Sequence, residues 1–444
     1  MRIIYPLLIL TLLTFSSSAE ILEVYPNPYN EEEEYVKISC QNNCTFTDFE
    51  KEFSFGEGIH YIAKNSTAFY KKFGFYPDAE GISLANSGEE IVLRDGTKVD
   101  VFNWAWLYTD EGIIYFKRNG SWDFKYEGWS SFKPVADFVS GKFILCPCDY
   151  KIEGEGIVYS YTIYDVDTFR GNFSFAVDAS PAGGIPMNVK LLSGKIYFLS
   201  SEIYRNFHAK FAVVGDKVVV TTENWKWNKR GVVVEFESER ISEVLREVFY
   251  SDVRFSTSPK TFGKFVKTER GSGKTINFEG RVTLYVMPDE NPIFGFIRKA
   301  KSRLYVVAPA VDFEYFNGTP LLDELVKASE RGVEVKVLVS YGDLNFLESY
   351  GIDVEYLRSP RIHGKYMISD ESVLVTSANL NKYGLKLNRE IALIIEDKNL
   401  ADELAENFMK DFRKGFDPKS YLLLLLSALT FLLTSTLLLR RKQL

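Results

Sequence analysis

Two stretches of the chain repeat one pattern, and they decide how the rest of the sequence is interpreted. Residues 208–224 read HAKFAVVGDKVVVTTEN, and residues 363–379 read HGKYMISDESVLVTSAN. The two stretches align without a gap at a separation of 155 residues, so that the histidine and the lysine of one coincide with those of the other. An internal repeat of this kind indicates two structural units of the same type within one chain.

Each copy predicts a strand that carries His-x-Lys, a tight turn, and a returning strand that ends in a hydroxyl and an amide. Side chains two residues apart on a strand point to the same face, so each copy places an imidazole and an ammonium together. Lysine, serine, threonine and asparagine suit phosphate oxygens, and none is a good metal ligand. We therefore expect a phosphate site without a metal ion. Its binding residues are Lys210, Lys365, Thr222, Ser377, Asn224 and Asn379.

The two motif histidines, His208 and His363, are the candidate catalytic residues. A histidine near neutral pH can act as a nucleophile or as an acid. If the two halves face each other, one imidazole can attack phosphorus while the other protonates the leaving oxygen. The alternative is a pair of core histidines, but the chain has only three histidines, and two of them occupy equivalent motif positions.

The second copy, with His363, Lys365 and Asp370, resembles the His-x-Lys-x4-Asp motif of the phospholipase D superfamily. The resemblance covers residues 135–415 and implies two mixed α/β halves whose motifs meet at a shared interface. It also implies a phosphohistidine mechanism that needs no divalent ion and no other cofactor.

The resemblance further implies roles for individual residues. His208 resembles the nucleophile and His363 the general acid. Asp370 is expected to orient one imidazole, and Glu390 resembles the downstream carboxylate that helps to orient a histidine. The residues with catalytic roles are thus His208, His363, Lys210, Lys365, Asp370 and Glu390.

The first copy departs from this pattern. Gly215 stands where the motif has its aspartate, and Asp216 follows it. The connections between the first strands of this half are little more than turns, so we expect it to lack the two helices of the second half. A phosphate-binding pseudoenzyme without turnover is therefore an alternative.

Beyond residue 132, apolar strands alternate with helical patterns, which favours an α/β fold. Helices are predicted at residues 291–302, 320–332 and 399–416. Runs of β-branched residues between and after them predict strands that are buried on both faces. The catalytic domain is expected at residues 131–416, with halves at about 131–255 and 276–416.

Residues 20–130 show short apolar runs broken by turn residues and no sustained helical period, which is typical of a small β-sandwich. The stretch LANSGEEIVL at residues 84–93, followed by TKVD at residues 97–100, resembles lamin-tail domains. Those domains are immunoglobulin-like sandwiches of about this size.

Both ends of the sequence indicate membrane chemistry. Arg2 is followed by an apolar run and then by small residues, which predicts a cleavable signal peptide at residues 1–19. Residues 421–439 carry no charge and are long enough, as a helix, to cross a bilayer, and three basic residues follow them. Because basic residues stay on the cytoplasmic side, we predict a single-pass cell-membrane protein with an extracellular body and a short cytoplasmic tail.

The predicted fold class is therefore an α/β phospholipase D-like fold of two similar halves, preceded by an all-β immunoglobulin-like sandwich and followed by one transmembrane helix. The chain also has four cysteines, for which three connectivities are possible. Their spacing does not match that of zinc sites, so structural disulfides are favoured. They are Cys40, Cys44, Cys146 and Cys148.

Composition narrows the function. The chain has 444 residues, of which 46% are hydrophobic, so it is not a disordered tail, and its net charge of -7 argues against a bulk nucleic-acid coat protein. The predicted activity is phosphodiester cleavage. Nucleic acid is the favoured substrate, because the compact catalytic body and the lamin-tail-like domain resemble those of secreted nucleases. A phospholipase or phosphatidyl transferase is the alternative, since the predicted anchor holds the site near a bilayer.

Overall fold

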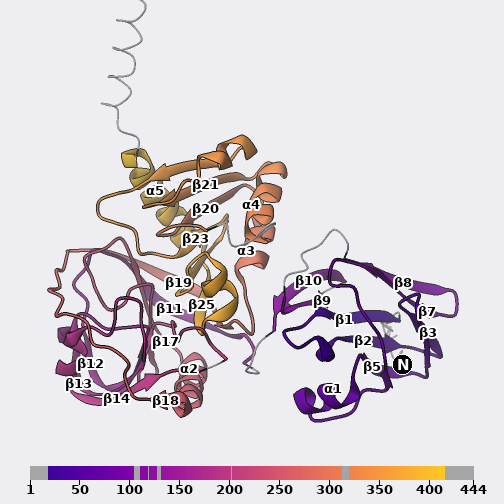
Figure 1. Cartoon of the computed structure of the whole chain (residues 1–444). Coiled ribbons are helices and arrows are strands. Elements are labelled where there is room, and N and C mark those ends of the chain that lie inside the picture. Colours follow the sequence, from indigo (N-terminus) through magenta and orange to yellow (C-terminus); the bar gives the residue numbers. More distant parts are fainter. Residues whose placement is uncertain are drawn as a thin grey trace, which may run out of the picture. The chain divides into compact units, whose positions relative to one another are not determined.

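The computed structural model describes residues 19–104, 111–118, 120–127, 132–201, 203–312 and 320–415. The chain divides into two compact units, Met1–Glu127 and Gly128–Leu444 (Figure 1). Each unit has its own sheets and its own buried core.

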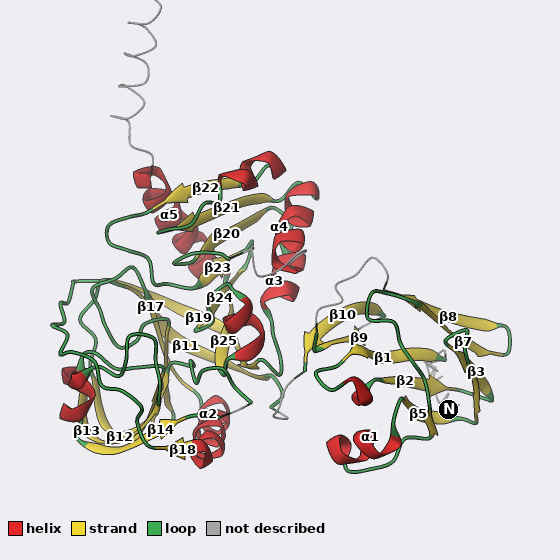
Figure 2. Ribbon diagram, viewed as in Figure 1, coloured by secondary structure: helices red, strands yellow, loops and turns green. Residues whose placement is uncertain are grey.

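The N-terminal unit contains two β-sheets (Figure 2). One has six strands, β1 (Glu20–Asn27), β2 (Tyr35–Cys40), β5 (Gly58–Ala63), β6 (Ala79–Glu80), β9 (Ile113–Arg118) and β10 (Ser121–Tyr126), in the order β10-β9-β1-β2-β5-β6. The other has four, β3 (Cys44–Thr47), β4 (Glu52–Phe55), β7 (Glu90–Asp95) and β8 (Lys98–Asn103), in the order β4-β3-β7-β8. Both sheets contribute fully buried side chains, such as Val36 and Phe46. The prediction of a largely β unit is confirmed, and its lamin-tail character stays a prediction.

One helix and one disulfide complete this unit. Helix α1 (Ser66–Phe73) begins after Asn65, whose side chain accepts hydrogen bonds from two backbone N–H groups of the first turn, and ends at Gly74 in the left-handed conformation. The Cys40–Cys44 disulfide connects β2 of one sheet to β3 of the other. The other two cysteines, Cys146 and Cys148, form a second disulfide in the C-terminal unit, which confirms the structural role predicted for all four.

The C-terminal unit is built on one continuous sheet of 15 strands. Its first half contains β11 (Val135–Leu145), β12 (Ile152–Ser160), β13 (Phe169–Asp178), β14 (Gly194–Leu199), β15 (Phe211–Val214), β16 (Lys217–Thr221) and β17 (Val232–Glu237), with β18 (Ser256–Thr257) at the edge. Its second half contains β19 (Lys274–Met287), β20 (Arg303–Val307), β21 (Glu334–Val339), β22 (Asp353–Tyr356), β23 (Tyr366–Ile368), β24 (Ser372–Thr376) and β25 (Glu390–Glu396).

The two halves of this sheet have the same topology. The first half is ordered β14-β13-β12-β15-β16-β17-β11, and the second is ordered β22-β21-β20-β23-β24-β25-β19. The long strands β11 and β19 pair antiparallel along the whole of β11 and join the halves. The sequence repeat thus corresponds to two equivalent half-sheets, as predicted.

The helices of the C-terminal unit differ between the halves. Helix α2 (Glu239–Asp252) packs on the first half, and α5 (Lys398–Gly415) packs on the second. Only the second half also has α3 (Ile293–Lys299) and α4 (Pro320–Glu330) between its first strands. At the matching places the described residues of the first half form no helix between β11 and β12, and they form only a 3-10 turn, Val166–Thr168, between β12 and β13. The predicted loss of two helices from the first half is therefore confirmed.

The predicted membrane topology needs correction. Among the residues that the structure describes, no helix combines the length and the apolar character needed to cross a bilayer. This finding overturns the prediction of a fold that ends in a membrane-spanning helix, and with it the predicted single-pass localisation. The segment 421–439, and the predicted signal peptide apart from Ala19, lie outside the described residues.

Candidate active site

The two His-x-Lys motifs occupy equivalent places at the junction between the halves. The first motif immediately precedes β15, and the second immediately precedes β23. The backbone N–H of His208 donates to the carbonyl of Arg389 at 2.9 Å, and that of His363 donates to the carbonyl of Arg230 at 3.0 Å. Each motif is therefore held by the main chain of the opposite half.

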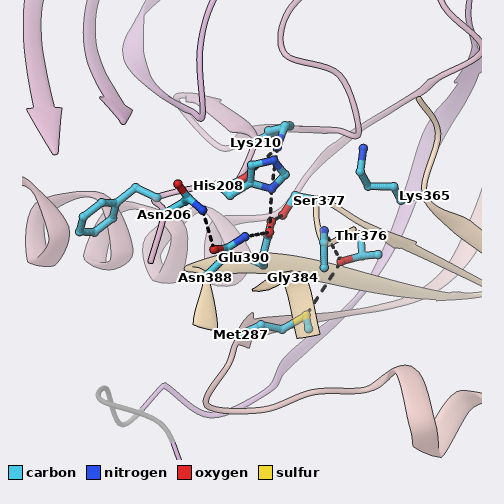
Figure 3. A network of polar contacts seen from close by, with 12 residues as sticks. Asn206, His208, Lys210, Met287, Lys365, Thr376, Ser377, Gly384, Asn388 and Glu390 are labelled. Carbon is cyan, nitrogen blue, oxygen red and sulfur yellow. Dashed lines mark hydrogen bonds and ion pairs between the residues drawn. The ribbon is translucent and has the colours of Figure 1, made fainter. Parts of the chain in front are cut away.

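Each motif histidine also pairs with a glutamate from the opposite half. Nδ1 of His208 lies 2.6 Å from Oε1 of Glu390 (Figure 3). Nδ1 of His363 lies 3.3 Å from Oε1 of Glu223. Glu390 is the first residue of β25, and Glu223 follows the end of β16. The predicted orienting role of Glu390 thus has a matching contact, and the contact connects the two halves.

The motif lysines are buried, and their hydrogen bonds to described residues go to backbone carbonyl groups and to an imidazole. Nζ of Lys210 donates to the carbonyl of His208 at 2.6 Å, and Nζ of Lys365 donates to the carbonyl of Thr222, in the other half, at 3.5 Å. The lysines are 0% and 1% exposed, and neither forms an ion pair with a residue that the structure describes. Glu223 and Glu390 act on both lysines electrostatically, yet burial still lowers the two lysine pKa values, and a bound anion would offset the cost of the buried ammonium groups. The two lysines therefore mark an anion site.

Burial controls the protonation states in this cluster. It lowers the pKa of both His208 and His363 to about 4. It also lowers the pKa of Lys210 to about 7 and that of Lys365 to about 8. Burial is the largest cause of these shifts. The charge of Lys365 also helps to lower the pKa of His208 and of Lys210, so the two motifs belong to one electrostatic site. Both imidazoles are neutral at pH 7, and a bound anion would raise the pKa of all four groups.

The two glutamates are ionised in the same cluster. Burial raises the pKa of Glu390, but His208 and Lys210 outweigh it and hold that pKa below its ordinary value. The pKa of Glu223 is lowered in the same way, against burial, by the nearby His363. An N–H at Nδ1 of His208 that donates to the Glu390 carboxylate leaves Nε2 of that ring free to act as a base or nucleophile.

The motif hydroxyls form hydrogen bonds with the two glutamates. Oγ of Ser377 donates to Glu390 at 2.5 Å and accepts from the N–H of Ile391 at 3.0 Å. Oγ1 of Thr222 donates to Glu223 at 3.5 Å and accepts from the next strand. Both hydroxyl residues are fully buried. Their partners in this structure are protein groups, so they support the two carboxylates, and their binding of substrate phosphate stays a prediction.

The motif asparagines keep the phosphate-binding role as a prediction. Both are partly buried beside the end of the second motif strand in their half. Oδ1 of Asn224 is buried and has no hydrogen-bond partner among the described residues. Asn379 occupies the matching position in the other half.

Asp370 is the clearest error among the predicted catalytic residues. Its carboxylate accepts hydrogen bonds from the backbone N–H groups of Lys301, Ser302 and Arg303, at 2.7, 2.9 and 3.1 Å. It therefore anchors the start of β20 and does not orient an imidazole. Gly215, its counterpart, lies in a left-handed turn at φ 55°. The first half, which has Gly215 at this position, therefore lacks the hydrogen bonds that Asp370 makes to the start of β20. Both histidine–glutamate pairs are nevertheless present.

Sequence reasoning missed Glu223 and Tyr161. Glu223 lies inside the repeat, where the second copy has Ala378, and this mismatch was the available signal. The ring of Tyr161 packs edge-on against His208 with centroids 4.7 Å apart, and Nζ of Lys210 lies 5.9 Å from its centroid. Nothing in the local sequence distinguishes Tyr161 from a core aromatic residue.

Comparison with known proteins finds a family model that matches part of the second half. Residues 293–412 match the family model described as "Cardiolipin synthase, PLD-like domain". These residues form a phospholipase D-like domain. The matched range contains the second motif and Glu390. The equivalence of the first half to this phospholipase D-like domain rests on its shared strand order and its His-x-Lys repeat.

Individual relatives of the phospholipase D-like domain have different activities. The chain is 36% identical over 108 residues to cardiolipin synthase B of Salmonella typhi, a match that covers 21% of this chain and 26% of that protein. It is 32% identical over 103 residues to the virion nicking-joining enzyme of monkeypox virus, covering 20% of this chain and 24% of that protein. The chain thus spans about a quarter of the length of these curated relatives. A solved structure, phosphatidylserine synthase of Haemophilus influenzae, aligns with a TM-score of 0.41 and 10% identity, over 59% of this chain and 81% of that one.

Proposed function

We propose that the protein is a phosphodiesterase of the phospholipase D superfamily that cleaves nucleic acid through a phosphohistidine. One observation carries the proposal: both imidazoles are paired with carboxylates across the junction of the halves, beside two buried lysines that form no ion pair with a described residue. Such a cluster can hold a phosphate anion, attack its phosphorus and protonate a leaving oxygen.

His208 is the better nucleophile of the two histidines. An imidazole that bonds to phosphorus gains positive charge, which a close carboxylate stabilises. Glu390 lies 2.6 Å from His208 and is itself held by Ser377 at 2.5 Å and by Asn388 at 3.1 Å. The Glu223 contact to His363 is longer, at 3.3 Å. His363, which has the longer contact, therefore suits the role of general acid, because that residue must lose a proton in one step and regain it in the next.

Two steps complete the reaction. First, Nε2 of His208 attacks phosphorus, the bond from phosphorus to the leaving oxygen breaks, and protonated His363 gives its proton to that oxygen. Second, neutral His363 takes a proton from water, the water oxygen bonds to phosphorus, and the phosphorus–nitrogen bond breaks. The anionic substrate raises the pKa of His363 and so supplies its protonated form for the first step.

Positive charge beside the site favours nucleic acid over a lipid. Lys226 and Lys229 lie in the same segment as Glu223. The charge of Lys229 helps to lower the pKa of Glu223, and the charge of Glu223 acts on the pKa of Lys226. Neither forms an ion pair with a described residue, and Lys226 stands over the ring of Tyr164 at 5.2 Å. Additional cations can hold the phosphates that flank the reacting one in a nucleic acid. A phospholipid with one phosphodiester does not use them.

Phosphatidyl transfer is the second candidate. The family model that matches residues 293–412 carries the description cardiolipin synthase, and cardiolipin synthase B is among the relatives. The same phosphohistidine would serve that reaction if an alcohol replaced water in the second step. The choice between the two substrates is experimental.

The test uses the full-length protein on single-stranded DNA, duplex DNA, RNA and phosphatidylglycerol vesicles under identical conditions. We expect strand cleavage and no phosphatidyl transfer. His208→Ala and His363→Ala should each lower kcat/KM by at least about 1,000-fold, because acid and nucleophile act as a unit. His60→Ala, a matched change of the third histidine in the N-terminal unit, should leave cleavage at the wild-type rate.

Two results would contradict this proposal. Wild-type cleavage by either motif variant would remove that histidine from the site. Phosphatidyl transfer without strand cleavage would replace the nuclease assignment with the lipid one. A phosphorylated His208 trapped during turnover of the wild-type protein, detected by mass spectrometry after alkaline denaturation, would support the proposed intermediate.

A further inference from the structure

The two halves supply their carboxylates from different strands. Thr221 of β16 pairs with Val233 of β17, and Thr376 of β24 pairs with Ala392 of β25. Continuing both registers by two residues places Glu223 opposite Gly231 in the first half, and Ala378 opposite Glu390 in the second. Each half thus has one cross-strand pair that contains a single carboxylate. In the first half the carboxylate is on the earlier residue of the pair, Glu223, and in the second half it is on the later residue, Glu390.

The carboxylate of Glu223 occupies the space that a side chain at residue 231 would need. A Cβ atom on Gly231 would lie 1.8 Å from Oε1 and 2.4 Å from Cδ of Glu223. Atoms in proteins do not approach so closely, so a side chain at residue 231 would displace the Glu223 carboxylate from its present position. The φ angle of Gly231 lies outside the left-handed region, and its backbone therefore permits any L residue. Packing, and not backbone conformation, accounts for this glycine.

We propose that Glu223 is the positioning residue of His363 and has replaced a carboxylate at residue 231, the position that Glu390 holds in the other half. This inference rests on the proposed phosphodiesterase function. In each half a motif hydroxyl beside the pair donates to the carboxylate, Thr222 to Glu223 and Ser377 to Glu390. Each carboxylate then reaches the histidine of the opposite half. The same task is therefore performed from two backbone positions.

The relocation has a functional consequence. Glu390 is held by two side chains at 2.5 and 3.1 Å, whereas the hydroxyl contact to Glu223 is 3.5 Å long. The side chain of His363 is 19% exposed, and that of His208 is 8% exposed. Glu223 therefore holds its histidine more loosely and closer to solvent. This suits a general acid that exchanges protons with the leaving group and with water.

The test moves the carboxylate between the two strands. Glu223→Ala should lower kcat by about 10- to 100-fold with little change in KM, because the ring loses its orientation but the lysines still bind phosphate. Glu223→Ala combined with Gly231→Glu should restore kcat to within a few-fold of wild type, since it reproduces the arrangement of Glu390 and Ala378. Gly231→Glu alone should destabilise the protein, because two side chains then compete for one space.

A second readout does not depend on catalysis. The chain has three histidines, so ring ¹⁵N signals can be assigned with single histidine variants. In Glu223→Ala the His363 signals should move and its pKa should fall, because the carboxylate that raises this pKa is gone. The signals of His208 and His60 should stay in place, and the double variant should return His363 toward its wild-type values.

The outcomes separate this inference from the proposed function. Unchanged His363 signals and unchanged kcat in Glu223→Ala would overturn the inference while cleavage by the wild-type protein upheld the function. A folded double variant that fails to recover either readout would also overturn it. If the wild-type protein cleaves no substrate, the proposed function fails, and the NMR signals alone decide whether Glu223 positions His363.

Discussion

Two buried histidines with low pKa values dominate the chemistry at the residue scale. His208 and His363 are neutral at pH 7 because burial lowers the pKa of each to about 4. Burial also lowers the pKa of Lys210 to about 7 and that of Lys365 to about 8, so at pH 7 Lys365 is mostly protonated and Lys210 is close to half protonated. A bound phosphate raises the pKa of its neighbours, and the mechanism uses the protonated form at His363 and at the two lysines while His208 stays neutral. This arrangement ties proton uptake to substrate binding.

The histidines make a prediction for stability against pH. An unfolded chain protonates a histidine near pH 6.5, whereas the folded protein resists protonation of these two until about pH 4. Between these values the unfolded chain binds more protons, so stability must fall as the pH falls through this window. The loss should approach about 3 kcal/mol for His208 at the acid end and be smaller for the more exposed His363.

Urea unfolding at pH 7.0, 5.5 and 4.5 measures this effect. The full-length protein should lose more stability over the series than the His208→Ala/His363→Ala variant, which lacks both titrations. Equal pH dependence in the two proteins would mean that the histidines titrate normally in the folded state.

At the scale of elements, two arginines fasten the halves to each other. Arg389, just before Glu390, forms ion pairs with Asp252 at the end of α2 and with Asp289, at 3.0 and 3.1 Å. Arg230, just before Gly231, forms an ion pair with Asp411 of α5. Each arginine thus connects one half to a helix of the other half. Arg389 precedes Glu390, which contacts His208, and Arg230 precedes Gly231, which leaves room for Glu223.

These ion pairs differ in burial, so their removal should differ in cost. Arg389→Met removes the buried guanidinium that pairs with Asp252 and Asp289 and should destabilise the protein by about 3–5 kcal/mol. Arg230→Met should cost less, because the Arg230 side chain is 19% exposed and that of Arg389 is 1% exposed. Urea midpoints of the two variants test the order. A larger loss for Arg230→Met would show that the weight given to burial is wrong.

At the scale of the whole catalytic unit, the site exists only where the two half-sheets meet. The β11–β19 pairing makes one sheet of the two halves, and each imidazole–carboxylate pair takes one member from each half. Positive charge at the site comes from the motif lysines, and from the imidazole of His363 once a bound anion raises its pKa. Within the described ranges, no group of three or more histidine, cysteine, aspartate or glutamate side chains could hold a metal ion.

Cleavage should accordingly persist in excess EDTA. The lysine and imidazole groups neutralise the phosphate oxygens in the proposed mechanism, so removal of divalent ions should change kcat/KM of the full-length protein by less than a few-fold. The control adds MgCl₂ in excess over EDTA to the same reaction. Activity that EDTA abolishes and zinc restores would contradict the mechanism.

Several features could be predicted from sequence because they depend on local pattern. The repeat of His-x-Lys at a fixed spacing indicated two equivalent halves, and runs of β-branched residues indicated their buried strands. The absence of two helices from the first half could be predicted because the connections between its first strands are too short to contain a helix. Glu390 was assigned because it lies a short distance downstream of a complete motif.

The partners within the site were decided only by tertiary structure. Glu223 and His363 lie far apart in sequence and meet because the half-sheets join along β11 and β19. Asp370 stands near His363 in sequence, yet its strand end turns the carboxylate toward the start of β20. Sequence spacing determines which face of a strand a side chain occupies, but it carries no information about which group from the other half lies opposite. The two carboxylates that serve the histidines, and the glycine that makes room for one of them, therefore became visible only in the folded molecule.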